Sequence, residues 1–234
     1  MFENFFMSMQ QDWKLFLFPP VLCAVFRGIF LHMYNPYPSL NGQWSKLHAC
    51  FRFGFWWGMD FNSYVFLVPL VLVTVPGLFF PFWNTAGDFI RLILVDIYCA
   101  ILYAAFMGKL IFYFHFRDTY NHILRLGLRA DRSNLVDIFF HQHHGLWILL
   151  GYIPFLMLCT IAEMWLLSLP SFTYPTFSSA IFSYAFNLVV VVAIGAAFYF
   201  FRYGGTFIHD NKPEWDNMPS IIKKDLFFCA SGRT

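Results

Sequence analysis

The chain has 234 residues, of which 59% are hydrophobic and 12% charged, and its formal net charge is +2. A soluble domain has about 25% charged residues, so this composition excludes an ordinary water-soluble fold. The small net charge, without a basic stripe that carries a recognition motif, argues against nucleic acid as a partner. Five apolar runs are each long enough to cross a bilayer, which takes about 20 residues. They lie near residues 15–34, 61–84, 89–114, 144–169 and 179–201.

These runs predict an all-α, polytopic membrane protein with five transmembrane helices. Residues 1–14 are predicted to form an amphipathic lead-in, and the absence of a basic n-region indicates a retained anchor rather than a cleaved signal peptide. The loop at 35–60 contains the aromatic-rich stretch Lys46–Trp57, which is typical of a helix lying in the membrane interface. We expect interfacial helices in this loop and in the loop at 115–136.

The chain divides into two parts. Residues 1–202 are predicted to form the transmembrane domain, and residues 203–234 a polar tail that begins a linker. The sequence stops at Cys-Ala-Ser-Gly-Arg-Thr directly after the apolar Leu226-Phe-Phe, so we expect a further domain to follow. Lysine and arginine concentrate in the two long loops and the tail, and the positive-inside rule places that side in the cytoplasm, with the N-terminus outside.

Five ionisable residues are predicted to lie within the spans, where a charge is costly and usually faces a partner or a polar cavity. Arg91 is expected at a membrane interface, and Lys109 is expected to extend its ammonium group towards the surface. Arg27 lies deep in its span, and Asp96 and Glu163 are its candidate counter-ions. The alternative is that this polar cluster binds an anionic lipid headgroup.

No catalytic motif is present in the sequence, which lacks G-x-S-x-G, a P-loop and G-x-G-x-x-G. The segment His141-Gln-His-His has the spacing H-x-H-H, whereas the boxes of membrane di-iron enzymes read H-x-x-H-H. We therefore interpret these histidines as interfacial residues that cap the fourth span, with metal ligation by spatial convergence left open. No catalytic residue, metal site or cofactor is predicted within this chain.

Three segments resemble lipoteichoic acid synthase-like proteins. The stretch Gly54-Phe-Trp-Trp-Gly-Met-Asp-Phe-Asn-Ser-Tyr64, which leads into an apolar span with Pro69, resembles the Gly–Arg–Asp pattern before their second span. Ile111–Tyr120 resembles the aromatic–Arg–Asp exit of their third span, and Arg202-Tyr-Gly-Gly205 resembles the turn that begins their extracellular linker. With five spans and similar loop lengths, the resemblance covers nearly the whole chain. One departure is that Arg52 has to replace the usual arginine.

Members of this family are phosphoglycerol or phosphoethanolamine transferases of the alkaline phosphatase/sulfatase superfamily. The resemblance implies a bacterial inner-membrane protein that acts on cell-envelope polymers or lipids. It also implies a cytoplasmic N-terminus, opposite to the orientation that the lysine and arginine count predicts, and a C-terminal extracellular domain. That domain, beyond residue 234, would hold a threonine nucleophile and a divalent metal, Mn or Zn.

The expected partners are therefore an anionic phospholipid, the bilayer and the chain's own C-terminal extracellular domain. The candidate contacts to a lipid headgroup or to that domain are Arg27, Arg52, Asp60, Arg117 and Asp118. The alternative function is a small non-enzymatic transporter or an assembly subunit, with a polar site near the membrane midplane. That site would be lined by Arg27, Asp96 and Glu163.

Overall fold

The computed structural model describes residues 2–37, 42–118, 136–209, 212–214 and 216–232. Within these ranges the regular structure is helical, with no strand. The prediction of a multi-pass, all-α membrane protein is confirmed, because five helical segments are long and apolar enough to cross a membrane. They are Phe2–Tyr34, Trp44–Leu78, Ala86–Phe116, Gly145–Ser168 and Ala180–Arg202.

The first span begins earlier than expected, because α1 (Phe2–Phe16) and α2 (Phe18–Tyr34) follow each other with only Leu17 between them. Residues 1–14, predicted as a lead-in, thus belong almost entirely to α1. Phe5 and Met9 lie four residues apart on one face of this helix, where both are buried in an apolar cluster with residues of the second span. This packing draws α1 into the bundle.

The second span also begins earlier, since α3 (Trp44–Pro69) includes the stretch predicted as a separate interfacial helix. One face of that stretch is buried against the C-terminal tail, which explains why it continues straight into the span. After Pro69, which lacks a backbone N–H, the helix continues as the π-helix η1 (Leu70–Thr74) and the 3₁₀ turn η2 (Pro76–Leu78). Most of the loop at 115–136 lies outside the described residues.

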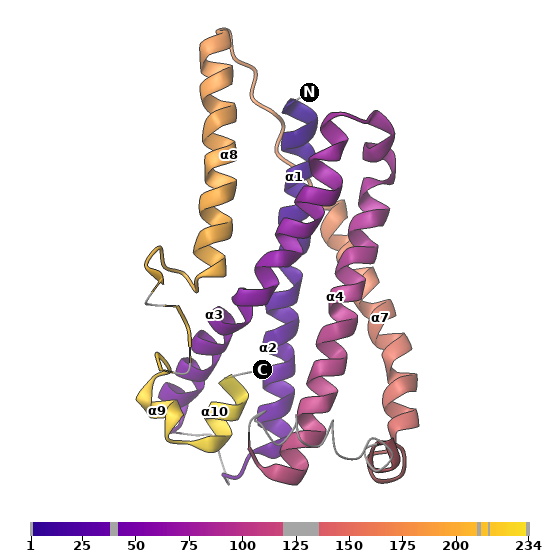
Figure 1. Ribbon diagram of the computed structural model, residues 1–234, viewed down its shortest axis with the longest axis vertical. Helices are drawn as coiled ribbons and strands as arrows, with labels where there is room; N and C mark the ends of the chain where they lie inside the picture. The colour runs from indigo at the N-terminus through magenta and orange to yellow at the C-terminus, as the bar shows by residue number, and fades with distance from the viewer. Residues whose placement is uncertain (1, 38–41, 119–135, 210–211, 215, 233–234) are drawn as a thin grey trace.

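The remaining elements complete a bundle around α3, which packs against α1, α2, α4, α8 and α10. Figure 1 shows the N-terminus near one end of the bundle and the tail helices α9 and α10 near the other, with α8 extending further towards the N-terminal end than α7. The bounds of these elements are α4 (Pro81–Phe116), η3 (Ile138–Gln142), α7 (Gly145–Ser168), α8 (Ala180–Arg202), α9 (Ser220–Lys223) and α10 (Leu226–Gly232).

The tail is part of the core at its end of the bundle. Phe26 of α2 stacks on Phe106 of α4 with ring centroids 4.3 Å apart. Phe227 and Phe228 of α10 are buried in the same apolar cluster. The sequence predicted a polar linker from residue 203 onward, but the segment that ends in α10 packs as a component of the membrane bundle.

A buried ion pair joins three of the spans at the N-terminal end. Arg91, which we expected at an interface, is 3% exposed, and its Nε donates to Asp12 Oδ1 at 2.6 Å. Thr74, at the end of the π-helix, donates to Asp12 Oδ2 at 2.6 Å and accepts from Arg91 at 2.8 Å. Arg91 also contacts Ser8 and Asp88. The irregular end of the second span therefore positions a hydroxyl between the two charges.

Arg91→Met should lower the free energy of unfolding by about 3–5 kcal/mol, because it leaves the Asp12 carboxyl buried without its partner. Thermal unfolding in detergent micelles measures the change. The double variant Asp12→Leu/Arg91→Met should recover most of the loss, since no buried charge remains. Asp88→Ala is the matched control: this carboxylate is 61% exposed, and its loss should cost less than about 1 kcal/mol. Equal losses in the single and double variants would contradict this account.

Candidate functional site

The carboxyl end of α10 points into the bundle and meets two buried cations. Arg27 Nε of α2 donates to the Ser231 carbonyl at 3.1 Å, and Lys109 Nζ of α4 donates to the Ala230 carbonyl at 2.6 Å. A helix carboxyl end has carbonyl oxygens without intrahelical donors and a partial negative charge, so both contacts are favourable. Arg27, a predicted lipid contact, therefore lies beneath the tail. Lys109, which was predicted to extend its ammonium group towards the membrane surface, is buried.

Gly54 lets Arg27 reach α10. A Cβ atom at this position would lie 2.2 Å from Nη2 of Arg27, so any larger residue would displace the guanidinium. Gly54 is the first residue of the segment that resembles the transferase family. In this structure its lack of a side chain leaves room for the Arg27 guanidinium to pack directly against the backbone of α3.

A double-glycine turn sends the tail back along α3. Gly204 and Gly205 both have positive φ, 74° and 81°, and a Cβ on Gly205 would lie 2.6 Å from the Trp56 ring. Directly before the turn, Arg202 forms an ion pair with Asp60, and Lys212 follows it with a contact to the same carboxylate at 3.2 Å. The predicted residue Asp60 thus fixes the start of the tail.

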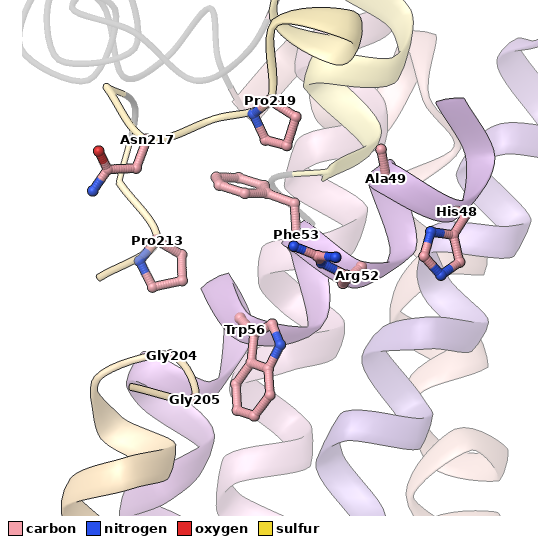
Figure 2. Close-up of a pocket in the computed structure, with 10 residues that line it drawn as sticks. All are labelled: His48, Ala49, Arg52, Phe53, Trp56, Gly204, Gly205, Pro213, Asn217 and Pro219. Atoms are coloured by element: carbon pink, nitrogen blue, oxygen red, sulfur yellow. The ribbon is translucent and has the colours of Figure 1, made fainter. Parts of the chain in front are cut away.

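A cavity of about 680 Å³ lies between the first half of α3 and the returning tail. Figure 2 shows Arg52 and His48 on the α3 side, with Pro213 and Asn217 of the tail facing them across the opening. Arg52 and His48 are both exposed. A guanidinium and an imidazole both suit an anionic group, and Arg52 gives this cavity one permanent positive charge.

A second cavity, of about 670 Å³, is more basic. We call it the Arg117 cavity. The guanidinium of Arg117 lies 5.9 Å from the Tyr113 ring centroid, a cation–π contact that holds the charge at the wall of the cavity. Of the described residues that line the cavity, Asp225 alone carries a carboxylate. Its charged and aromatic lining residues are Lys46 of α3, Arg117 at the end of α4, Lys224 and Asp225 between α9 and α10, Tyr37, Tyr113 and Phe227.

Asp225 is held in its ionised form. Tyr37 donates to Asp225 Oδ2 at 2.6 Å, and Lys46 Nζ lies 3.0 Å from the same oxygen. Burial alone would raise the pKa of Asp225, but these contacts and the Phe228 backbone N–H together hold that pKa below its ordinary value. Asp225 therefore offsets the charge of Lys46 at neutral pH, and the cavity keeps an excess of positive charge from Arg117 and Lys224.

The two intramembrane acids lie together between α4 and α7. Thr160 donates to both oxygens of Asp96, at 3.0 and 3.1 Å. Glu163 is fully buried; its Oε1 accepts from Cys99 Sγ at 3.5 Å, and its Oε2 has no hydrogen-bond partner among the described residues. We predicted that these acids pair with Arg27, and the Arg27 contact described above is to the Ser231 carbonyl of α10.

Three of the histidines make close polar contacts, one with a carboxylate and two with each other. His115 Nε2 and His143 Nε2 lie 2.6 Å apart, and His141 Nδ1 lies 2.7 Å from Asp137. Burial, together with the neighbouring His115 and His144, lowers the pKa of His143 and favours its neutral form. In the described part of the chain, no three histidine, cysteine or acidic side chains gather to hold a metal ion.

The predicted contacts therefore reach one end of the molecule without forming one site. Arg52 and Arg117 line separate cavities on either side of the tail, Asp60 holds the tail's start, and Asp118 follows Arg117 as a half-buried residue. Sequence reasoning missed three charged residues of the Arg117 cavity, because isolated charges in a loop and a tail carry no spacing signal. They are Lys46, Lys224 and Asp225.

Comparisons of the chain with protein-family models, with curated proteins and with solved structures gave no match.

Lys109→Met should loosen α10. A buried hydrogen bond from a charged donor contributes about 1.5–3 kcal/mol, so transient opening of α10 should become at least about tenfold more frequent. Cys229, buried within α10, is a native probe. Its maleimide labelling rate in detergent, located by mass spectrometry, should rise by that factor.

Lys14→Met is the matched control, because Lys14 Nζ donates to the Leu167 and Leu169 carbonyls at the carboxyl end of α7, at the opposite end of the bundle. This variant should leave the labelling rate of Cys229 unchanged. An equal increase in both variants would mean that general destabilisation, and not release of α10, exposes the thiol.

Proposed function

We propose that this chain is the membrane part of a bacterial inner-membrane phospholipid headgroup transferase, which moves phosphoglycerol or phosphoethanolamine onto cell-envelope polymers or lipids. Its role is to hold the donor lipid in the Arg117 cavity. The catalytic, sulfatase-like domain would follow residue 234 and supply the divalent metal and the threonine nucleophile. No residue of this chain is assigned to bond breaking.

The observation that carries the proposal is the charge of the Arg117 cavity. Three cations from three separate segments surround it against one carboxylate, and that carboxylate is already engaged by Lys46 and Tyr37. A lipid phosphate brings a negative charge and acceptor oxygens, and a guanidinium can bind two of those oxygens at once. Polar groups between aromatic rings at a span end are also typical of the headgroup region.

The position of the cavity supports the same conclusion. Its walls come from the end of α4 and from the tail that, by the resemblance, leads to the catalytic domain. A headgroup bound there would lie beside the segment that connects the two parts. Lys46, Arg117 and Lys224 share this end of the bundle, and in the transferase orientation they face outwards, where an anionic lipid substrate accounts for their charge.

The coding sequence beyond residue 234 tests the transferase assignment directly. An open frame that encodes a threonine nucleophile with histidine and aspartate metal ligands would support it, and a stop codon at position 235 would contradict it.

Lys224→Gln should weaken binding of phosphatidylglycerol to the full chain in nanodiscs by about fivefold, since one cation at a membrane surface contributes about 1 kcal/mol towards an anionic lipid. Arg117→Gln should weaken it by at least as much. Native mass spectrometry of retained lipids, with phosphatidylcholine as reference, measures the effect.

Lys223→Gln removes the same charge from the neighbouring position, which does not line the cavity, and should change lipid retention little. If Lys223→Gln and Lys224→Gln reduce retention equally, the effect is general electrostatics and the cavity is not the headgroup site. In a protein that carries the catalytic domain, Arg117→Gln should lower turnover of vesicle-embedded donor but leave hydrolysis of a water-soluble phosphodiester unchanged.

One observation favours the alternative, a small transporter. The buried Glu163 and the half-buried Asp96 form an acidic patch inside the membrane, and such groups often carry protons or cations. Glu163→Gln in proteoliposomes separates the two functions. Lost proton flux would favour transport, whereas unchanged flux with unchanged phosphatidylglycerol retention would favour the headgroup transferase.

A further inference from the structure

An apolar groove of about 210 Å³ runs between α3 and α4. Val68, Ile97 and Ile101 on its walls are exposed, and they belong to helices that are long and apolar enough to span a membrane. Near its base, the Tyr98 hydroxyl donates to Asn62 Oδ1 at 2.6 Å, so the nearest polar groups satisfy each other and offer little to water. The lining residues include Tyr64, Val68, Leu94, Ile97, Tyr98 and Ile101.

Tyr64 connects this groove to a charged cluster. The Tyr64 ring lines the groove, its hydroxyl accepts from Arg202 Nε at 3.4 Å, and the Arg202 guanidinium lies 5.7 Å from the ring centroid. Arg202 and Lys212 share the single carboxylate of Asp60. All three charged side chains are partly open to solvent, and these described residues leave one positive charge in excess, since two cations share one carboxylate.

A phosphodiester carries one negative charge, which complements that excess. A membrane phospholipid is the ligand that presents a phosphodiester and an acyl chain together, in the order in which the cluster and the groove are arranged. We propose that the groove between α3 and α4 holds one acyl chain of a phospholipid whose phosphodiester contacts Arg202 and Lys212. The site shares no residue with the Arg117 cavity and does not rest on the proposed function.

The test uses the full chain in nanodiscs with phosphatidylglycerol that carries a diazirine on its acyl chain. Crosslinks mapped by mass spectrometry should fall on Ile97 and Ile101 at least about fivefold more often than on the lipid-exposed α8 residues Val189 and Val192, the factor that one surface cation gives towards an anionic lipid. Equal labelling of both surfaces would overturn the proposal, because it would indicate ordinary bulk lipid.

Two variants examine the two ends of the site. Val68→Trp fills the groove and should reduce labelling at Ile97 to the α8 level, whereas Val192→Trp, the same change on an open face, should not. Lys212→Gln removes the excess charge but keeps the Arg202–Asp60 pair, and should reduce labelling by phosphatidylglycerol about fivefold. A diazirine-bearing diacylglycerol has the chains without the phosphate. If it labels the groove as well as phosphatidylglycerol does, the proposal is wrong.

Discussion

Carbonyl oxygens at helix ends need donors wherever water is scarce, and this bundle provides buried or half-buried cations for them. Lys14 donates to the carboxyl end of α7, and Arg27 and Lys109 donate to that of α10. Each contact satisfies orphan carbonyls and places a positive charge at the negative end of a helix dipole. The intramembrane cations that look like ligand-binding groups in the sequence therefore have structural partners, and the cations that line the two cavities come from α3, the end of α4 and the tail.

The tail organises that surface. Its double-glycine turn and the Asp60–Arg202 pair direct the chain along α3, and α10 then closes the end of the bundle. The returning chain supplies one wall of the cavity that contains Arg52 and His48, and one wall of the Arg117 cavity. Tyr64, which lines the groove between α3 and α4, contacts Arg202 just before this turn. Both cavities are therefore arranged around the segment that follows Arg202.

The five spans could be predicted because a long apolar run has few alternatives to crossing a bilayer. The helix starts could not, because the polar faces of α1 and early α3 resemble an interface until their burial against other helices is known. Arg91 shows the same limit: its partner Asp12 lies 79 residues away in the chain, in a segment that composition alone assigns to the surface. For the Arg117 cavity, the sequence indicated Arg117 from its position at a span end. It could not indicate Lys46 or Lys224, whose proximity depends on how the tail folds back.

The inward direction of α10 has a mechanical consequence. Any force applied to the chain beyond Gly232 would act first on a short helix whose last carbonyls are held by Arg27 and Lys109. The load would pass to α2 and α4 at depth within the bundle, and not to an exposed hinge at the membrane surface. Gly54 lets Arg27 reach this position. A Gly54→Ala substitution adds a single methyl group that would displace the Arg27 guanidinium, and it would therefore weaken the attachment of α10 to α2.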